Sequence, residues 1–258
     1  MNTGLRLVSI AALLALVSCS MVYKTDQQES NTDDQYSKRD FNPTIQGRWI
    51  GNGISYSPYR DGEGPDTEGL TSKEHILEDL MIIAQRWNLI RLYGADPQHR
   101  RILEVIRDNN LPIKVMQGIW LDGHQTDAEN TAQVEEGIKL ANEFPEIITA
   151  VNVGNEIFVY WSWHRIEDMD AVIDEIRHVR KNIKQPVTVS DDYNFWNKPE
   201  AQKVAAELDF ICLHGYAIWN KQFLDNAMKW TEETYNDIQR RHPNHKIAFC
   251  ETGWPTSR

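Results

Sequence analysis

Two glutamates stand at the ends of apolar runs that are suited to buried strands. Glu156 closes the run IITAVNVGNE, and Glu251 lies in the run KIAFCETGW much later in the chain. Either glutamate alone could be a solvated strand-end acid or a neighbour of a helix N-cap. A pair in one pocket could instead perform glycoside hydrolysis with retention, in which a carboxylic acid protonates the leaving oxygen and a carboxylate about 5–5.5 Å away attacks the anomeric carbon. Asn155, beside Glu156, favours the catalytic interpretation, because polar groups that converge at strand ends are typical of active sites.

The elements that carry these residues alternate regularly. From residue 49 onward, short runs rich in Val, Ile and Leu are each followed by a longer amphipathic stretch, and the runs begin roughly 33 residues apart, the size of one βαβ repeat. The expected strands are residues 49–56, 89–94, 112–120, 147–156, 186–192, 209–216 and 246–254. The expected helices are residues 71–87, 97–109, 127–143, 167–184, 198–206 and 221–241.

This alternation predicts an α/β fold, a (β/α)8 TIM barrel, because apolar strands that alternate with helices form parallel sheets covered on both faces. A doubly wound sheet is the main alternative, but no glycine-rich phosphate-binding loop follows the first strand. In a barrel the working face lies at the C-terminal ends of the strands. Glu156 ends the fourth expected strand and Glu251 the seventh, so both would point into one pocket. The first helix opens with TSKE at Thr71, which predicts a capping box.

Most tryptophans fall at or just after the ends of expected strands. A rim of flat rings that stack on sugar faces would explain this clustering, whereas core filling would scatter the tryptophans through helices and strand interiors. For any single tryptophan, packing in the core is an equal alternative. The strand-end tryptophans are Trp120, Trp161, Trp163, Trp196, Trp219 and Trp254, and the others are Trp49, Trp87 and Trp230.

The composition narrows the class of substrate. The chain has 258 residues, 41% of them hydrophobic and 25% charged, as expected of a globular protein with one large core. Its formal net charge of −11 disfavours nucleic acid and other strongly anionic polymers, which require Lys and Arg patches. A neutral substrate fits this charge better.

Four motifs, GISYSPYR, RLYG, VGNE and ETGWPT, occur in this order at the expected strand positions. Together they resemble glycoside hydrolase family 17 in its bacterial branch, over roughly residues 50–256. The resemblance implies a TIM barrel that acts with retention as a β-1,3-glucan hydrolase or glucanosyltransferase. It further implies that Glu156 is the acid/base, Glu251 the nucleophile, and Asn155 the residue that bonds the sugar 2-hydroxyl.

Further side chains are substrate-binding candidates. Tyr216 resembles the family tyrosine that hydrogen-bonds the nucleophile, and a buried tyrosine bonded to backbone is the alternative. Arg91, on the second strand, could hold the nucleophile's charge through a forked contact or form an ion pair inside the barrel. Tyr56, in the motif GISYSPYR, is also a substrate-binding candidate. The tryptophans counted with them are Trp120, Trp161, Trp196, Trp219 and Trp254.

No metal or cofactor is expected. The histidines that could suggest a metal are His124, His164 and His214, but no HxH or HExxH spacing accompanies them. His214 is instead expected to line the pocket wall or satisfy a hydrogen bond in the core. Asp191 and Asp192, after the fifth strand, could contact sugar hydroxyls or act in a loop or a helix cap.

Two cysteines lie in the expected barrel. If Tyr216 and Glu251 both point into the barrel, strict alternation along the strands turns Cys212 inward and Cys250 outward. No disulfide is therefore expected between them.

The N-terminus reads as a processing signal. Residues 1–19 combine an early Arg6, an apolar stretch too short to span a bilayer, and small residues before Cys19. The sequence LVSC resembles a lipobox, in which Cys19 becomes lipid-modified; a plain secretory signal is the alternative. Residues 20–45 are polar and aperiodic, which indicates a flexible tether. The expectation is a catalytic domain at 46–258, lipid-anchored to the bacterial envelope, in the outer membrane and facing the periplasm or the exterior.

The sequence also predicts that the barrel lacks its last β/α unit. Only seven strands are expected, and residues 46–258 fall short of the ~250 typical of this barrel by roughly one β/α unit. The prediction is a barrel truncated after its seventh strand, with unpaired edges on its first and seventh strands.

Three functions remain open on the sequence. The first is a retaining hydrolase of β-1,3-glucan outside the cell, acting on the polysaccharide or its oligosaccharides. The second is a β-1,3-glucanosyltransferase with the same chemistry but a sugar as acceptor. The third is a glycan-binding lipoprotein without turnover.

Overall fold

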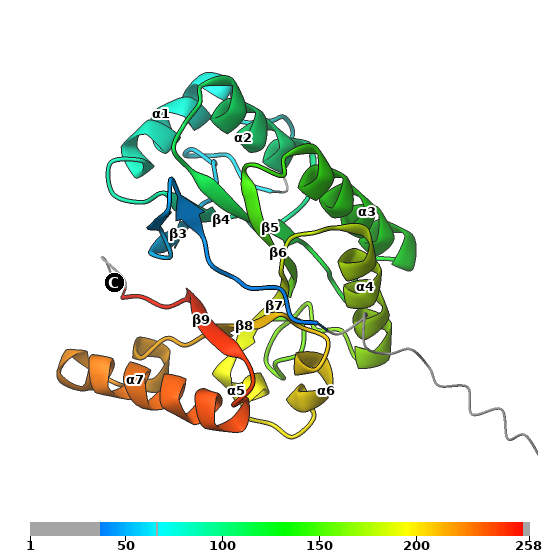
Figure 1. Ribbon diagram of the computed structural model, residues 1–258, viewed down its shortest axis with the longest axis vertical. Helices are drawn as coiled ribbons and strands as arrows, with labels where there is room; N and C mark the ends of the chain where they lie inside the picture. Colours follow the sequence, from blue (N-terminus) through cyan, green and yellow to red (C-terminus); the bar gives the residue numbers. More distant parts are fainter. Residues whose placement is uncertain (1–36, 66, 255–258) are drawn as a thin grey trace, which may run out of the picture. The chain divides into compact units, whose positions relative to one another are not determined.

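Seven parallel strands form the wall of a barrel (Figure 1). The computed structural model describes residues 37–65 and 67–254, which belong to one compact unit. Each strand pairs with the next one in the chain, so the strand order follows the sequence. The strands are β3 (Gly53–Ser55), β4 (Leu89–Arg91), β5 (Lys114–Ile119), β6 (Ile148–Asn155), β7 (Val187–Asp192), β8 (Phe210–His214) and β9 (Lys246–Glu251). The predicted barrel fold and its seven strands are confirmed.

Helices lie outside the strands and connect them (Figure 1). Among the described residues, no helix is both long and apolar enough to cross a membrane. The helices are α1 (Lys73–Ile83), α2 (Pro97–Asp108), α3 (Asp127–Glu143), α4 (Met169–Asn182), α5 (Tyr193–Trp196), α6 (Ala201–Ala205), the 3₁₀ turn η1 (Ile218–Asn220) and α7 (Leu224–Arg241). The short α5 and η1 were not expected from the sequence.

Side-chain caps begin several of these helices. Thr126 and Glu129 form a reciprocal capping box at the start of α3. The capping box predicted at Thr71 is wrong, because the N-cap of α1 is Ser72, whose side chain accepts from the backbone of His75. Thr71 is buried, and its hydroxyl donates to Glu63 instead.

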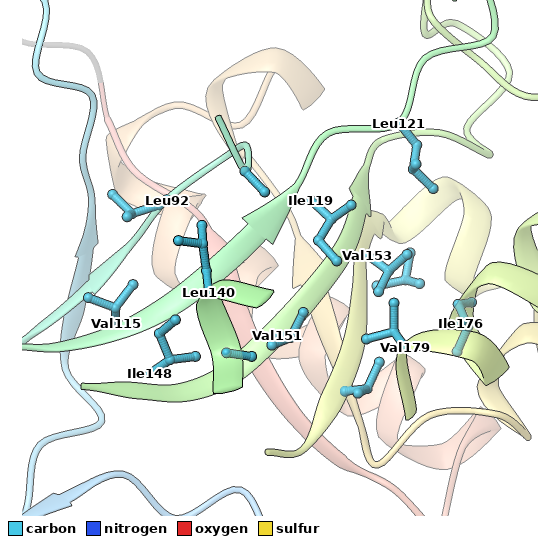
Figure 2. Packing of buried hydrophobic residues seen from close by; sticks show 14 of the residues in the cluster. Leu92, Val115, Ile119, Leu121, Leu140, Ile148, Val151, Val153, Ile176 and Val179 are labelled. Carbon is cyan, nitrogen blue, oxygen red and sulfur yellow. The ribbon is translucent and has the colours of Figure 1, made fainter. Parts of the chain in front are cut away.

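Branched aliphatic side chains fill the space between the strands and the surrounding helices. Figure 2 shows Val151 and Val153 of β6 near Leu140 of α3 and Ile176 and Val179 of α4. All five are fully buried. Burial of each such side chain contributes about 1.5–3 kcal/mol relative to exposure. This packing fixes the strand that directly precedes Glu156.

The N-terminal segment of the described chain packs against the barrel. The ring of Phe41 stacks on that of Phe210, with ring centroids 4.2 Å apart, and the backbone N–H of Arg39 donates to Asp209. A short hairpin, β1 (Thr44–Ile45) and β2 (Arg48–Trp49), follows. The final part of the expected tether, from residue 37 to 45, is therefore part of the folded unit. The earlier expectations, namely the signal at 1–19, Cys19 and most of the tether, lie outside the described residues.

The two outer strands of the sheet are not paired with each other within the part of the chain that the structure describes. This agrees with the expected unpaired edges on the first and seventh strands. Every residue of β9 is half-buried or exposed, whereas β4, β7 and β8 are buried along their whole lengths. A cavity of about 920 Å³ lies beside these edges, lined by residues of β3 and β9 and by Trp49 and Trp87.

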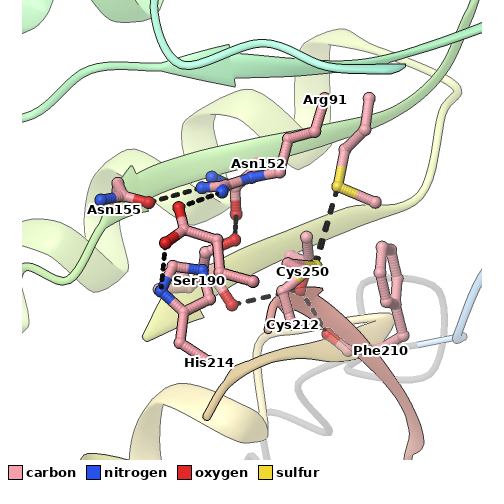
Figure 3. The surroundings of a disulfide bond; sticks show 12 residues. Arg91, Asn152, Asn155, Ser190, Phe210, Cys212, His214 and Cys250 are labelled. Carbon is pink, nitrogen blue, oxygen red and sulfur yellow. Dashed lines mark hydrogen bonds and ion pairs between the residues drawn. A yellow bond between two sulfur atoms is a disulfide. The ribbon is translucent and has the colours of Figure 1, made fainter. Parts of the chain in front are cut away.

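A disulfide joins Cys212 of β8 to Cys250 of β9, with Cα atoms 5.3 Å apart (Figure 3). The predicted absence of a disulfide is wrong. Leu213 pairs with Phe249, but His214 pairs with Glu251, so Cys250 is an extra residue that bulges from the ladder. The bulge breaks the strict alternation on which the prediction depended, and Cys250 turns toward Cys212 in the barrel interior.

Candidate active site

Glu156 follows directly on β6 at the mouth of the barrel. Its own φ of 51° and that of Gly154, 85°, are left-handed, and the strand ends at this turn. The backbone N–H of Glu156 donates to the carbonyl of Ser190 on the neighbouring strand, at 2.8 Å. A non-glycine residue with positive φ is uncommon, and such strained positions cluster at functional sites.

Gly154 is required at its position for two reasons. Its φ favours glycine, and an added Cβ would lie 2.4 Å from Cδ1 of Ile157. We expect Gly154→Ala to destabilise the fold by about 1–3 kcal/mol more than Gly47→Ala, since overpacking adds to the backbone cost. Gly47 is a matched control because its φ is 78° and nothing lies within 4 Å of the added Cβ. Urea denaturation measures both variants, and equal losses would contradict the role of the Ile157 contact.

Glu251 ends β9 and receives three hydrogen bonds at its carboxylate. Arg91 donates at 2.6 Å and Tyr93 at 3.0 Å to Oε1, and Tyr216 donates at 3.0 Å to Oε2. Burial of Glu251 by itself opposes ionisation, but the charges of His214 and Arg91 and the hydrogen bonds outweigh it, so the pKa of Glu251 lies below its ordinary value. Glu251 is therefore held as a carboxylate.

The guanidinium of Arg91 joins two candidate residues. Besides Glu251, it donates through Nη2 to Oδ1 of Asn155 at 2.5 Å. The ring of His164 donates from Nε2 to the carbonyl of Asn155 at 2.6 Å. Both the backbone and the side chain of Asn155 are thus held in place, and no described residue bonds its amide N–H groups, so they can bind a ligand.

His214 lies between the two glutamates. Its Nδ1 is 3.0 Å from Oε1 of Glu156 and 3.7 Å from Oε2 of Glu251, and its side chain is fully buried. Arg91, Asn155 and His214 converge in the same region of the barrel in Figure 3. One ligand atom of each residue in the trio Glu156, His214 and Glu251 lies within 4.8 Å of the others, so this set could also hold a cation.

The separation of the two carboxyl groups is chemically informative. A Glu156 oxygen and a Glu251 oxygen lie within 4.8 Å of each other. Carboxyl groups about 5–5.5 Å apart are typical of retaining glycosidases, whereas inverting enzymes keep theirs about 6.5–9.5 Å apart to admit a water. The two groups are therefore close enough for one to act as a nucleophile beside the other.

A cavity of about 620 Å³ opens over both glutamates. Trp161 and Trp219 contribute to its lining and are 49% and 73% exposed, which leaves their faces free for stacking. The described residues that line it are Glu156, Tyr160, Trp161, Asp192, Asn194, Tyr216, Trp219, Asn220 and Glu251. The sequence-predicted Glu156, Glu251, Tyr216, Trp161 and Trp219 are thus brought together, with Arg91 and Asn155 beneath them.

Other predicted site residues lie elsewhere. Trp196 is fully buried, and its indole N–H donates to the carbonyl of Cys212, so its assignment to sugar stacking is wrong. Tyr56 is also in the core, where its hydroxyl donates to Asp79. Trp120 packs on His164 with ring centroids 4.8 Å apart, and Trp254 is 41% exposed; neither is among the described residues that line the cavity.

Asp191 and Asp192, at the end of β7, have different roles. Asp191 is buried and accepts from the backbone N–H groups of Phe158 and Asp192, and its burial raises the pKa of its carboxyl. Asp192 is the N-cap of α5 and also lines the cavity. The alternative of a capping role, which the sequence left open, is thus correct for Asp192.

Sequence reasoning missed one site residue. Tyr93 lies within the motif RLYG, and its hydroxyl bonds Glu251. Tyr93 shares the strand parity of Arg91, two residues earlier, and this signal could have found it. His214 was expected at the pocket wall or in a core hydrogen bond; it is fully buried and contacts Glu156, which agrees with the second alternative, although Glu156 was not predicted as its partner.

A parallel barrel with two close glutamates and aromatic side chains at its mouth has the architecture of a glycoside hydrolase catalytic domain. A family model for the BtgE/BtgC glycoside hydrolase domain matches residues 53–258, which is most of the chain. The protein belongs to this family.

A protein of Aspergillus niger, provisionally named a glucan endo-1,3-β-glucosidase, is 29% identical over 216 residues. The match covers 79% of this chain and 31% of that protein. The glucan endo-1,3-β-glucosidase of Emericella nidulans is 23% identical over 214 residues, with 79% of this chain and 32% of that protein covered. The chain spans about a third of the length of the curated relatives it matches.

Solved structures share the fold. An endo-laminarinase from Formosa has a TM-score of 0.69 at 22% identity, covering 80% of this chain and 67% of that one. A family 17 β-1,3-glucanosyltransferase from Rhizomucor miehei has a TM-score of 0.63 at 17% identity, covering 80% and 72%. The family resemblance predicted from the four motifs is confirmed.

Proposed function

We propose that this domain cleaves β-1,3-glucan with retention of anomeric configuration, with Glu251 as nucleophile and Glu156 as acid/base. The observation that carries the proposal is the close pair of carboxyl groups, one of which is held ionised by Arg91, Tyr93 and Tyr216. The names of the similar proteins support β-1,3-glucan as the substrate class.

In the first step, the carboxylate of Glu251 attacks the anomeric carbon while Glu156 donates a proton to the departing glycosidic oxygen. The three donors on Glu251 keep it ionised and fix its direction before substrate arrives. The amide N–H groups of Asn155 bond the sugar 2-hydroxyl, a contact that strengthens in the transition state. Arg91 thereby positions the nucleophile and the 2-hydroxyl donor together.

In the second step, Glu156, now a carboxylate, takes a proton from the acceptor, which attacks the glycosyl-enzyme and releases Glu251. His214 lies against Glu156 and fixes the orientation of its carboxyl group in both steps. Trp161 and Trp219 provide exposed rings beside this centre on which glucose units stack. Water as acceptor gives hydrolysis, and a second glucan gives transfer.

Product sizing tests the proposal. Purified protein is incubated with linear and with branched β-1,3-glucans and, in parallel, with a β-1,4-glucan as the control. We expect shortened β-1,3 products and no change in the β-1,4 polymer. Products longer than the starting oligosaccharide would identify a glucanosyltransferase. Binding of the glucan without any new product would refute catalysis and leave a glycan-binding lipoprotein.

The proposal extends to location: the domain acts outside the cytoplasm, anchored to the envelope through a lipid on Cys19. The signal-like residues 1–19 support this part. In a bacterial host fed labelled palmitate, we expect label on the full chain and its loss in Cys19→Ala. A labelled Cys19→Ala protein, or an unlabelled wild type found in the cytoplasm, would exclude the anchor.

A further inference from the structure

The strand that carries Glu251 is, together with β3, one of the two least buried strands of the barrel. All six residues of β9 are half-buried or exposed, and its outer edge is not paired with β3 among the described residues. The ladder with β8 is moreover interrupted by the bulge at Cys250, immediately before Glu251. Hydrogen bonding to β8 alone therefore leaves this end of β9 loosely held.

The disulfide acts at this weak point. Cys250 is the bulged residue itself, and its bond to Cys212 ties it to β8, a strand that is buried along its whole length. Past the bond, the backbone N–H of Gly215 donates to the carbonyl of Glu251 at 3.0 Å. The covalent link thus fixes the backbone one residue before the candidate nucleophile, where no ladder pair does so.

We propose that the Cys212–Cys250 disulfide is a positioning element, which holds Glu251 in register with Arg91, Tyr93 and Tyr216. This inference rests on the proposed role of Glu251. A shift of about 1 Å at a reacting group can cost on the order of 10²-fold in rate. Without the bond, the bulged end of β9 relaxes, the three donors lose their alignment, and the nucleophile is less well held.

Reduction offers a way to break the bond without mutation. Cys250 lines a small cavity of about 70 Å³ beside β3, together with Ser55, Arg91 and Met116. A dithiol reductant attacks one sulfur, forms a mixed disulfide and then closes to its own cyclic disulfide. The disulfide of the protein is thereby reduced to the thiols of Cys212 and Cys250, and the dithiol is oxidised. Removal of the dithiol and air oxidation should restore the bond.

The test compares oxidised protein, dithiol-reduced protein and the Cys212→Ala/Cys250→Ala variant, well below their melting temperatures. We expect kcat to fall about tenfold with KM within about twofold, because binding to the aromatic rings is unaffected. The acid limb of the pH profile should move to higher pH, since the charges of His214 and Arg91 and the hydrogen bonds from Arg91 and Tyr93 keep the pKa of Glu251 low. Reoxidation of the wild type should reverse both changes.

Met116→Ala is the matched control. Its sulfur lies 3.7 Å from that of Cys212 in the same cluster, so the variant loses packing but keeps the disulfide. We expect it to melt earlier without a shift of the acid limb. An equal shift in Met116→Ala, an unchanged limb after reduction, or loss of near-UV circular dichroism on reduction would each overturn the inference, because the bond would then be merely structural.

A readout without substrate separates this inference from the proposed function. Carbon NMR of protein with labelled glutamate side chains, assigned with Glu251→Gln, gives the titration of Glu251 directly. A rise in the pKa of Glu251 on reduction supports the positioning role even if no glucan is cleaved, in which case only the proposed function fails. An unchanged titration in an active enzyme refutes the inference alone.

Discussion

Glu251→Gln should lower the turnover of linear β-1,3-glucan by on the order of 10³-fold or more, because the amide cannot form the covalent intermediate. Gln has nearly the same shape and can still bond the hydroxyls of Tyr93 and Tyr216, which now contact the carboxylate. The loss should therefore fall on kcat, while glucan binding persists. Reducing-end release measures the rate, and calorimetric titration of the glucan measures binding.

Glu175→Gln is the matched control, since Glu175 is a glutamate on α4 that is absent from the described lining of the cavity. It should leave turnover unchanged. A stricter check uses Glu251→Gly with an activated aryl β-glucoside and azide. The anion should displace the leaving group directly and give the α-glycosyl azide, because the configuration inverts once. Near-native turnover of Glu251→Gln would refute the assignment of the nucleophile.

Glu156→Gln should show a loss that depends on the leaving group. The glycosidic oxygen of glucan needs a proton to depart, so polymer cleavage should fall by on the order of 10²–10⁴-fold. An aryl glucoside with an acidic phenol needs little help, and its first step should stay close to the wild-type rate. The intermediate should then accumulate, visible as a burst of phenol.

Azide distinguishes the acid/base role of Glu156 from the nucleophilic role of Glu251. It should accelerate the second step of Glu156→Ala and give the β-glycosyl azide, since two inversions preserve the configuration. The same anomer from both glutamate variants would contradict the separate roles. Equal losses on glucan and on the aryl substrate would show that Glu156 is not the general acid.

Much of the fold could be predicted because apolar runs and helical periods each recur at the spacing of a β/α unit. The strand expected at 147–156 is β6 at Ile148–Asn155, and the helix expected at 127–143 is α3 with the same bounds. Because these elements are buried, their apolar residues recur with a clear period, and that period identifies the type of secondary structure. Boundaries moved where local capping chemistry decided them, as at Ser72.

Two rules predicted much of the candidate site: side chains alternate in direction along a strand, and site residues lie at the C-terminal ends of the strands. Those two rules place Glu156, Glu251 and Tyr216 at one mouth. They fail at Cys250, because one bulged residue reverses the alternation and cannot be seen in a sequence that reads as a regular strand. They also fail for Trp196, whose short helix α5 turns the ring into the core, where its N–H finds the carbonyl of Cys212.

The outer edges of β3 and β9, which are not paired with each other among the described residues, affect how the protein loses activity on heating. Amides at the edges of β3 and β9 that have no strand partner among the described residues should exchange with deuterium sooner than those of β5 to β7, because water reaches them without global opening. Glu251 belongs to that early-opening unit, while Glu156 directly follows the well-covered β6. Warming should therefore abolish turnover before it abolishes ellipticity, with inactivation that reverses on cooling. Coincident loss of turnover and ellipticity would mean that β9 opens only with the whole barrel.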